Sequence, residues 1–60
     1  MALNQVELQN LRHIIGAHEM ISQKLQAYAQ QATDQQVRSC FQKSSQEAQS
    51  TMQELITFLK

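Results

Sequence analysis

A chain of 60 residues forms one small domain, which buries only about 60% of the surface that its unfolded form exposes. Its single cysteine excludes a disulfide framework, no spacing is typical of a zinc site, and five basic residues balance five acidic ones. So short a chain needs a partner to complete its core, and its neutral charge does not attract nucleic acid or an anionic membrane surface. We therefore expect at least a homodimer, with no nucleic acid and no membrane among its partners.

The composition favours helix along the whole chain. Twelve glutamines, one glycine and no proline indicate this, because Gln, Ala, Leu, Met, Glu and Lys all have high helix propensity. No basic region followed by an apolar run opens the sequence, and no apolar stretch is long enough to span a bilayer. We expect an all-α protein, made in the cytoplasm, with residues 1–60 forming one domain.

The first predicted helix covers about residues 5–31. Asn4 and Glu7 have the spacing of a capping box, so the helix is expected to begin at about Gln5. Residues at alternating spacings of three and four form a seam on one face: Leu11, Ile14, His18, Ile21, Leu25, Tyr28 and Ala32. A flanking row recurs every seven residues: Leu8, Ile15, Ser22 and Ala29. Together the two rows exceed what one neighbouring helix covers, which indicates a second partner.

A turn is predicted at about residues 32–34. Thr33, with Gln36 three residues later, and Asp34 both qualify as the N-cap of a second helix. Because short connections join antiparallel neighbours, the two helices are expected to form a hairpin.

The second predicted helix covers about residues 35–59 and repeats the alternation. Its seam contains Val37, Phe41, Ser44, Ala48, Thr51, Leu55 and Phe58, with Met52 and Leu59 at the edge. Folding at the turn places Tyr28 beside Phe41, and His18 near Ala48 and Thr51. We expect two such hairpins to dimerise into an antiparallel four-helix bundle. The predicted dimer core contains Leu8, Leu11, Ile14, Ile15, His18, Ile21, Leu25, Tyr28, Phe41, Ala48, Leu55 and Phe58.

His18 is the one ionisable residue on either seam, and two interpretations of it are open. A neutral imidazole there is expected to bond the Thr51 hydroxyl or the Glu47 carboxylate, which satisfies it without a ligand. The alternative is a metal site that a dimer assembles from His18, Glu19 and Glu47. The chain lacks the Glu-x-x-His spacing of carboxylate-bridged metal sites in helical bundles, so we favour the first interpretation and expect no metal.

The sequence offers no recognisable catalytic machinery. Cys40 has no matched histidine and is interpreted as a small buried apolar residue. Neither a Ser/His/Asp arrangement nor a glycine-rich phosphate loop occurs. We therefore expect neither enzymatic activity nor a cofactor.

A set of residues spread over both predicted helices resembles a known pattern: His18-Glu19, Lys24, Tyr28-Ala29, Asp34 and Phe41. Over about residues 8–59 the chain resembles the spore coat protein F (coat F) family of spore-forming Firmicutes, which is similar to ferritin-like four-helix bundles. The resemblance implies half of a ferritin-like bundle and a sporulation-associated structural protein. It also implies a place in the spore coat or forespore, with other spore coat proteins as further partners.

The chain departs from that family in its second helix. Family members carry histidines there, whereas this chain has Ser44, Ser45, Glu47, Ser50 and Thr51. We therefore expect a non-enzymatic structural or adaptor protein that acts as a homodimeric bundle. Two alternatives stay open: a ferritin-like metal-binding dimer, and a regulatory helical module that pairs with the helices of another protein.

Overall fold

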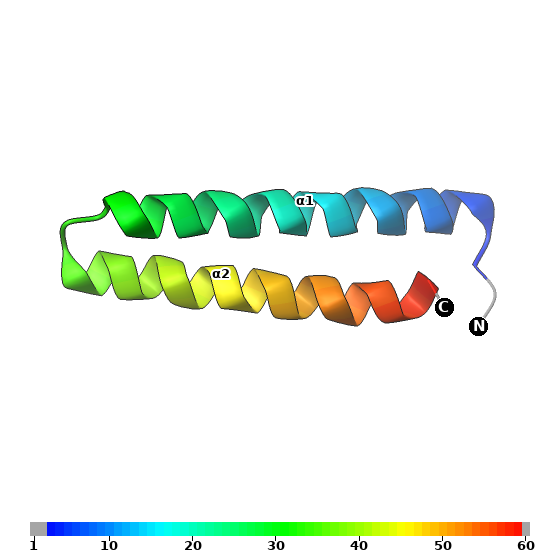
Figure 1. Ribbon diagram of the computed structural model, residues 1–60. Coiled ribbons are helices and arrows are strands. Elements are labelled where there is room, and N and C mark those ends of the chain that lie inside the picture. The colour runs from blue at the N-terminus through cyan, green and yellow to red at the C-terminus, as the bar shows by residue number, and fades with distance from the viewer. Residues whose placement is uncertain (1–2, 60) are drawn as a thin grey trace.

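The computed structural model describes residues 3–59, which form two long antiparallel helices and contain no strand (Figure 1). Helix α1 covers Gln5–Gln31, helix α2 covers Gln35–Ile56, and a short 3-10 helix, η1, covers Thr57–Leu59. The Cα trace extends over 46 × 14 × 11 Å. The predicted all-α hairpin is therefore confirmed, although α2 gives way to η1 before residue 59.

Side-chain caps start both helices. The Asn4 side chain accepts a hydrogen bond from the backbone N–H of Glu7 at 2.7 Å, and the Glu7 carboxylate accepts one from the backbone N–H of Asn4 at 3.2 Å. This is the predicted capping box. At the turn, Asp34 accepts from the backbone N–H of Val37 at 2.9 Å, so Asp34 and not Thr33 is the N-cap of α2. Its carboxylate also lies at the positive end of the helix dipole.

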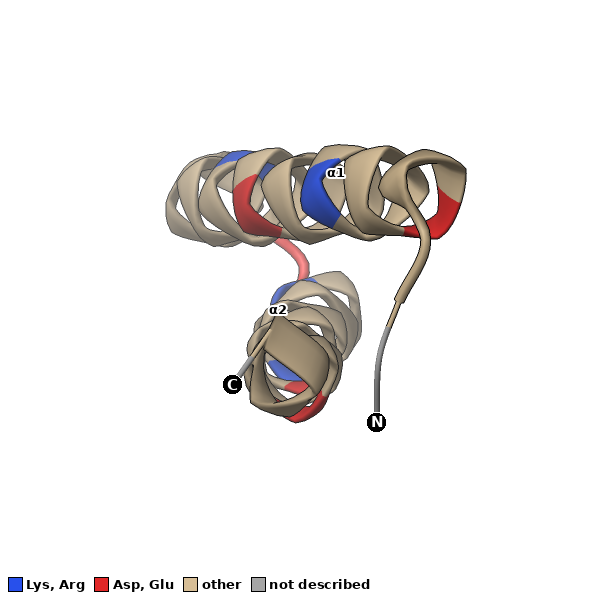
Figure 2. Ribbon diagram, turned by 90° about the vertical axis from the view of Figure 1, so that its right-hand side faces the viewer, with Lys and Arg blue, Asp and Glu red and all other residues tan. Residues whose placement is uncertain are grey.

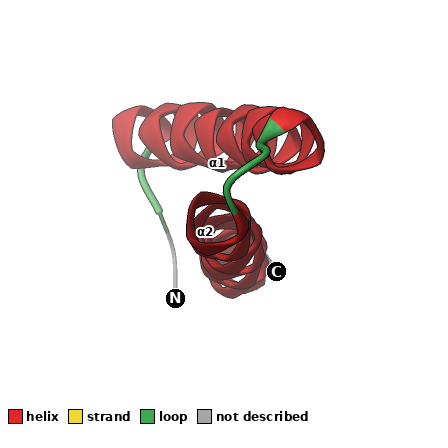
Figure 3. Ribbon diagram, turned by 90° about the vertical axis from the view of Figure 1, so that its left-hand side faces the viewer, coloured by secondary structure: helices red, strands yellow, loops and turns green. Residues whose placement is uncertain are grey.

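Arg38 ties the first turn of α2 to the end of α1. Its guanidinium Nη2 donates to the carbonyl of Ala32, the C-cap of α1, at 2.8 Å. A cation at this position complements the negative end of the helix dipole and satisfies a carbonyl that has no partner within the helix. The contact joins the two helix ends across the turn, which Figure 3 views end-on.

The closest approach of the two helices is made by small side chains. Ser22 and Ala29 of α1 and Ser45 and Ala48 of α2 are buried, each 8% exposed or less. The Ser45 hydroxyl donates to the Ser22 carbonyl at 3.0 Å, and the two hydroxyl oxygens lie 3.1 Å apart. The Ser22 hydroxyl also lies 3.3 Å from the Ser45 carbonyl oxygen. This polar pair is fully satisfied and sets the antiparallel register of the hairpin.

Half-buried residues continue this contact along both helices, which are inclined to one another (Figure 2). They recur at spacings of three and four, as in a coiled coil. Ser44 and Ile56 of α2 are half-buried as well and flank this row. The row itself contains Leu8, Leu11, Ile15, His18 and Leu25 of α1, Ala32 at its C-cap, and Arg38, Phe41, Met52 and Leu55 of α2. With the four buried residues, this row forms the internal seam of the hairpin.

The predicted seam of α1 is partly wrong. Ile14, Ile21 and Tyr28 are 46%, 51% and 50% exposed, whereas Ser22 and Ala29, which were expected on the flank, are buried between the helices. The row with Ile21 and Tyr28 and the row with Ser22 and Ala29 fit the helical period equally well. The internal row is the one with small side chains, because two helix backbones approach closely only where little side-chain volume separates them.

In α2, too, residues that face the other helix lie one position after the predicted ones. Val37 and Phe58 are 43% and 46% exposed, whereas Ser45 is buried and Met52 is half-buried. Three residues of the predicted seam do lie in the observed internal seam: Phe41, Ala48 and Leu55. The predicted proximity of Tyr28 and Phe41 is confirmed, with ring centroids 6.1 Å apart and ring planes inclined by 55°. Such a tilted pair is a favourable aromatic geometry.

Replacing Gly16 by Ala is expected to stabilise the protein by about 1 kcal/mol, since Gly16 is exposed within α1 and an added Cβ meets no atom within 4 Å. For a domain of this size the midpoint of thermal unfolding, followed by circular dichroism, should rise by about 4–8 °C. Ala17→Gly, at the next exposed position, is the matched control and should lower it by a similar amount. A lower midpoint for Gly16→Ala would mean that another molecule packs against this face.

Candidate interaction surface

The two long sides of the hairpin differ in chemistry. Residues at seven-residue intervals beside the buried row lie on one side of both helices, because antiparallel helices bring equivalent flanking positions together. In α1 this row contains Glu7, Ile14, Ile21 and Tyr28, and in α2 it contains Val37, Ser44, Thr51 and Phe58. We call the seven residues other than Glu7 the apolar side. The ring contact between Tyr28 and Phe41 joins the two helices on this side.

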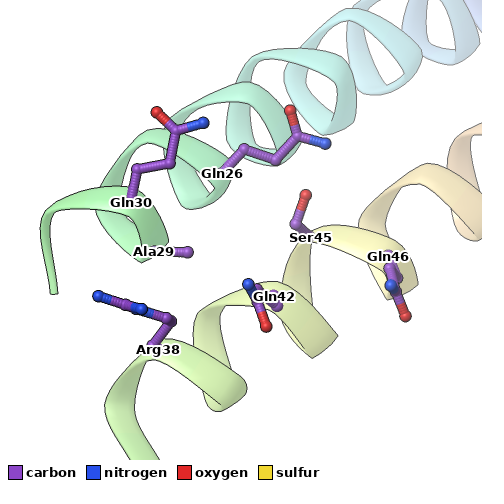
Figure 4. A pocket seen from close by; sticks show the side chains of 7 residues that line it. All are labelled: Gln26, Ala29, Gln30, Arg38, Gln42, Ser45 and Gln46. Atoms are coloured by element: carbon purple, nitrogen blue, oxygen red, sulfur yellow. The ribbon is translucent and has the colours of Figure 1, made fainter. Parts of the chain in front are cut away.

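The opposite side carries a polar groove of about 660 Å³, which we call the glutamine groove (Figure 4). Its lining comes from both helices: Gln26, Ala29, Gln30, Arg38, Gln42, Ser45 and Gln46. Figure 4 shows Arg38 reaching toward the end of α1, while the amides of Gln30 and Gln46 spread away from each other. The groove is open and its polar groups do not converge on one point, so it has the character of a solvated helix face.

Most of the large apolar surface that the hairpin leaves uncovered lies on the apolar side. Its five large residues are between 43% and 51% exposed: Ile14, Ile21, Tyr28, Val37 and Phe58. Val6, Met20 and Leu59 are also exposed, but Val6 and Met20 lie on the outer face of α1 and Leu59 lies in η1. Large apolar residues gathered on one side in this way, in contrast to scattered single residues, are typical of an interaction surface.

A hollow of about 350 Å³ lies where the apolar side reaches the open end of the hairpin. Leu3, Glu7, Asn10, Leu11 and Ile14 line it. The Glu7 carboxylate accepts the capping hydrogen bond from Asn4. The hollow is shallow and open, and it joins the apolar stripe through Ile14.

His18 lies in the internal seam and is half-buried. Its Nδ1 is 2.8 Å from the carbonyl oxygen of Ile14, one turn earlier in the same helix. Because a carbonyl only accepts, Nδ1 carries the proton and donates. The expected bond to Thr51 or Glu47 is therefore wrong, since the backbone of the same helix lies nearer to the imidazole.

The described part of one chain, residues 3–59, contains no group of three or more His, Cys, Asp or Glu side chains placed to hold a metal ion. It therefore does not bring His18, Glu19 and Glu47 together. Cys40 is exposed and its thiol is free, so its interpretation as a buried residue is wrong. Cys40 lies two residues beyond Arg38, outside the internal seam.

Charged residues are interspersed on both helices (Figure 2). The seven residues of the apolar side include none, and the same row continues to a charged residue, Glu7, at the open end of the hairpin. Neither long helix within residues 3–59 combines the length and the apolar content needed to cross a lipid bilayer.

The fold and this surface define a class of protein: a short helical hairpin with one polar side and one uncovered apolar side. Comparison of the chain with protein-family models, curated proteins and solved structures finds no match.

Proposed function

We propose that this chain is a non-enzymatic structural or adaptor protein that acts as a homodimeric four-helix bundle, formed through the apolar side. The observation that carries the proposal is the uncharged apolar stripe along one side of the hairpin, with five large residues half exposed. Burying such side chains contributes about 25 cal/mol per Å² of apolar surface removed from water.

The hairpin alone has too little core to be stable. The four buried residues of the described part are small, since they are two serines and two alanines. A chain of this length usually needs a disulfide, a metal or a partner. A second hairpin on the apolar side supplies that partner, because it covers the exposed stripe and closes the half-buried internal seam.

The dimensions of the apolar side suit a dimer. It runs along a molecule 46 Å long and up to 14 Å wide at the Cα atoms. With side chains added, such a side is comparable with the roughly 800 Å² per partner of a standard stable interface. All twelve predicted core residues lie either in the internal seam or on the apolar side, so this dimer accounts for the whole set.

A second copy is the partner that the charge pattern favours. The chain has no net charge, so two copies do not repel one another as whole molecules. The apolar side itself is uncharged and therefore needs no oppositely charged partner. Two-fold symmetric dimers are also the commonest oligomers of soluble proteins.

We further propose a role in the spore coat or forespore, after synthesis in the cytoplasm. The support is the resemblance to the coat F pattern, whose residues His18-Glu19 and Tyr28-Ala29 lie on α1 and whose Asp34 caps α2. In such a coat the dimer is a small building block, and other spore coat proteins are its further partners.

Native mass spectrometry of the purified, untagged protein tests this function, because one spectrum reports both subunit number and bound metal. We expect a metal-free dimer. A monomer would contradict the homodimer and, with low helix content by circular dichroism, would favour a regulatory module that folds on another protein. A dimer with bound metal that is lost in His18→Ala would favour the ferritin-like alternative instead.

A further inference from the structure

We propose that the two hairpins of the dimer associate side by side in the same direction, with turn next to turn and a two-fold axis along the bundle. In this arrangement α1 of one copy packs on α2 of the other. The inference rests on the proposed homodimer and names the geometry of its interface.

The register of the hairpin places the stripe residues of the two helices in layers. The hydrogen bonds between Ser22 and Ser45 fix this register. Ile21 and Ser44, which precede them, lie within about 3 Å of the same level, since an α-helix rises about 1.5 Å per residue. Steps of seven residues along both helices generate two more layers, Ile14 with Thr51 and Tyr28 with Val37.

The side chains of these layers differ in size between the two helices. In each of the three layers the α1 residue is larger than the α2 residue. At the open end the next layer pairs Glu7 of α1 with the exposed ring of Phe58 of α2, and here the relation is reversed, because Glu7 lines the hollow together with Leu11 and Ile14. The apolar side is therefore a ridge on α1 beside a trough on α2, except at the open end.

Only one of the two symmetric arrangements matches ridge with trough. A two-fold axis along the bundle places α1 over α2 of the second copy at the same level, so that Ile21 meets Ser44 and Phe58 meets the hollow. An axis across the bundle places α1 on α1 and α2 on α2. The Ile21 side chains of the two copies then clash, and cavities form beside Ser44 and Thr51. The close packing of protein cores disfavours both.

The charges at the edges of the apolar side favour the same arrangement. Lys24 borders the α1 stripe, and Glu47 and Glu54 border the α2 stripe, with Glu47 near the middle of the helix. With turns side by side, Lys24 of one copy lies within about four residues of the level of Glu47 of the other, about 6 Å along the axis. In the crossed arrangement the two Glu47 carboxylates face each other near the axis, where like charges repel.

A distance measurement between spin labels at the turn tests the orientation. Thr33 is exposed and is not the N-cap, so Thr33→Cys in a Cys40→Ser background carries one nitroxide per chain. With turns side by side, the labels should be less than about 25 Å apart, since packed helix axes are about 10 Å apart. In the crossed arrangement they should be about 40 Å apart, close to the 46 Å length of the molecule.

A label at Gln23, exposed near the middle of α1, is the matched control. The two Gln23 labels of a dimer lie within the measurable distance range in either arrangement, so this control tests whether a dimer forms and not how it is oriented. A short Thr33 distance supports the inference. A long one, with a normal Gln23 signal, overturns the orientation and leaves the proposed dimer intact. Loss of the dipolar signal at both positions overturns the dimer itself.

Discussion

Replacing Ile21 by Asp is expected to dissociate the proposed dimer, weakening self-association by about 100-fold or more, which corresponds to about 3 kcal/mol. Ile21 is 51% exposed in the single hairpin and lies at the centre of the apolar side, so the change leaves the internal seam untouched. In the dimer, two carboxylates would be buried without partners. Analytical ultracentrifugation measures the association, and circular dichroism should show that helix content falls with it, because the proposed dimer supplies the partner that so small a core needs.

Two control variants separate loss of association from loss of folding. Met20→Asp changes the adjacent residue, which is 58% exposed on the outer face of α1, and should leave the dimer intact. Leu25→Asp places a charge in the internal seam and should abolish both helix and dimer. An Ile21→Asp protein that stays dimeric would show that the apolar side is not the interface, and a well-folded monomer would refute the shared core.

Replacing Ser22 by Leu is expected to destabilise the protein by about 2–3 kcal/mol, because the larger side chain forces apart two helices at their closest contact. Ser22 is 2% exposed and its hydroxyl lies 3.1 Å from that of Ser45. The midpoint of thermal unfolding should fall by about 10–20 °C for a domain of this size.

The double variant Ser22→Ala with Ser45→Ala is the control for the hydroxyl groups. Removing both partners of a buried hydrogen bond leaves neither unsatisfied, so its stability should stay within about 1 kcal/mol of the parent. If Ser22→Leu were as stable as the parent, the row containing Ile21, and not the row containing Ser22, would face the second helix.

The helix limits at the N-terminus and the turn could be predicted because their signals are local. Asn4 and Glu7 lie three residues apart, and the short turn ending at Asp34 leaves no alternative to an antiparallel pair. The bond from Arg38 to Ala32 could not be predicted in the same way. It depends on the direction in which the chain reverses, which no spacing along one helix encodes.

The residues of the candidate interface could be predicted as members of the dimer core, but not their place on the outside of the single hairpin. Ile21, Tyr28 and Phe58 were expected in the dimer core, yet the same alternation assigned them to the contact within the hairpin. The preference of His18 for the Ile14 carbonyl was also missed, since a bond within the helix competes with any partner across the seam.

Two antiparallel helices with a seven-residue rhythm follow from local signals in the sequence, because propensity, capping and turn length act over a few neighbouring residues. Which row of that rhythm faces inward is known only from the packing of the two helices. Neighbouring rows satisfy the helical period equally well, and the choice depends on how closely two backbones can pack. Ser22, Ala29, Ser45 and Ala48 allow the closest approach, and this leaves the larger row containing Ile21 on the outside of the hairpin.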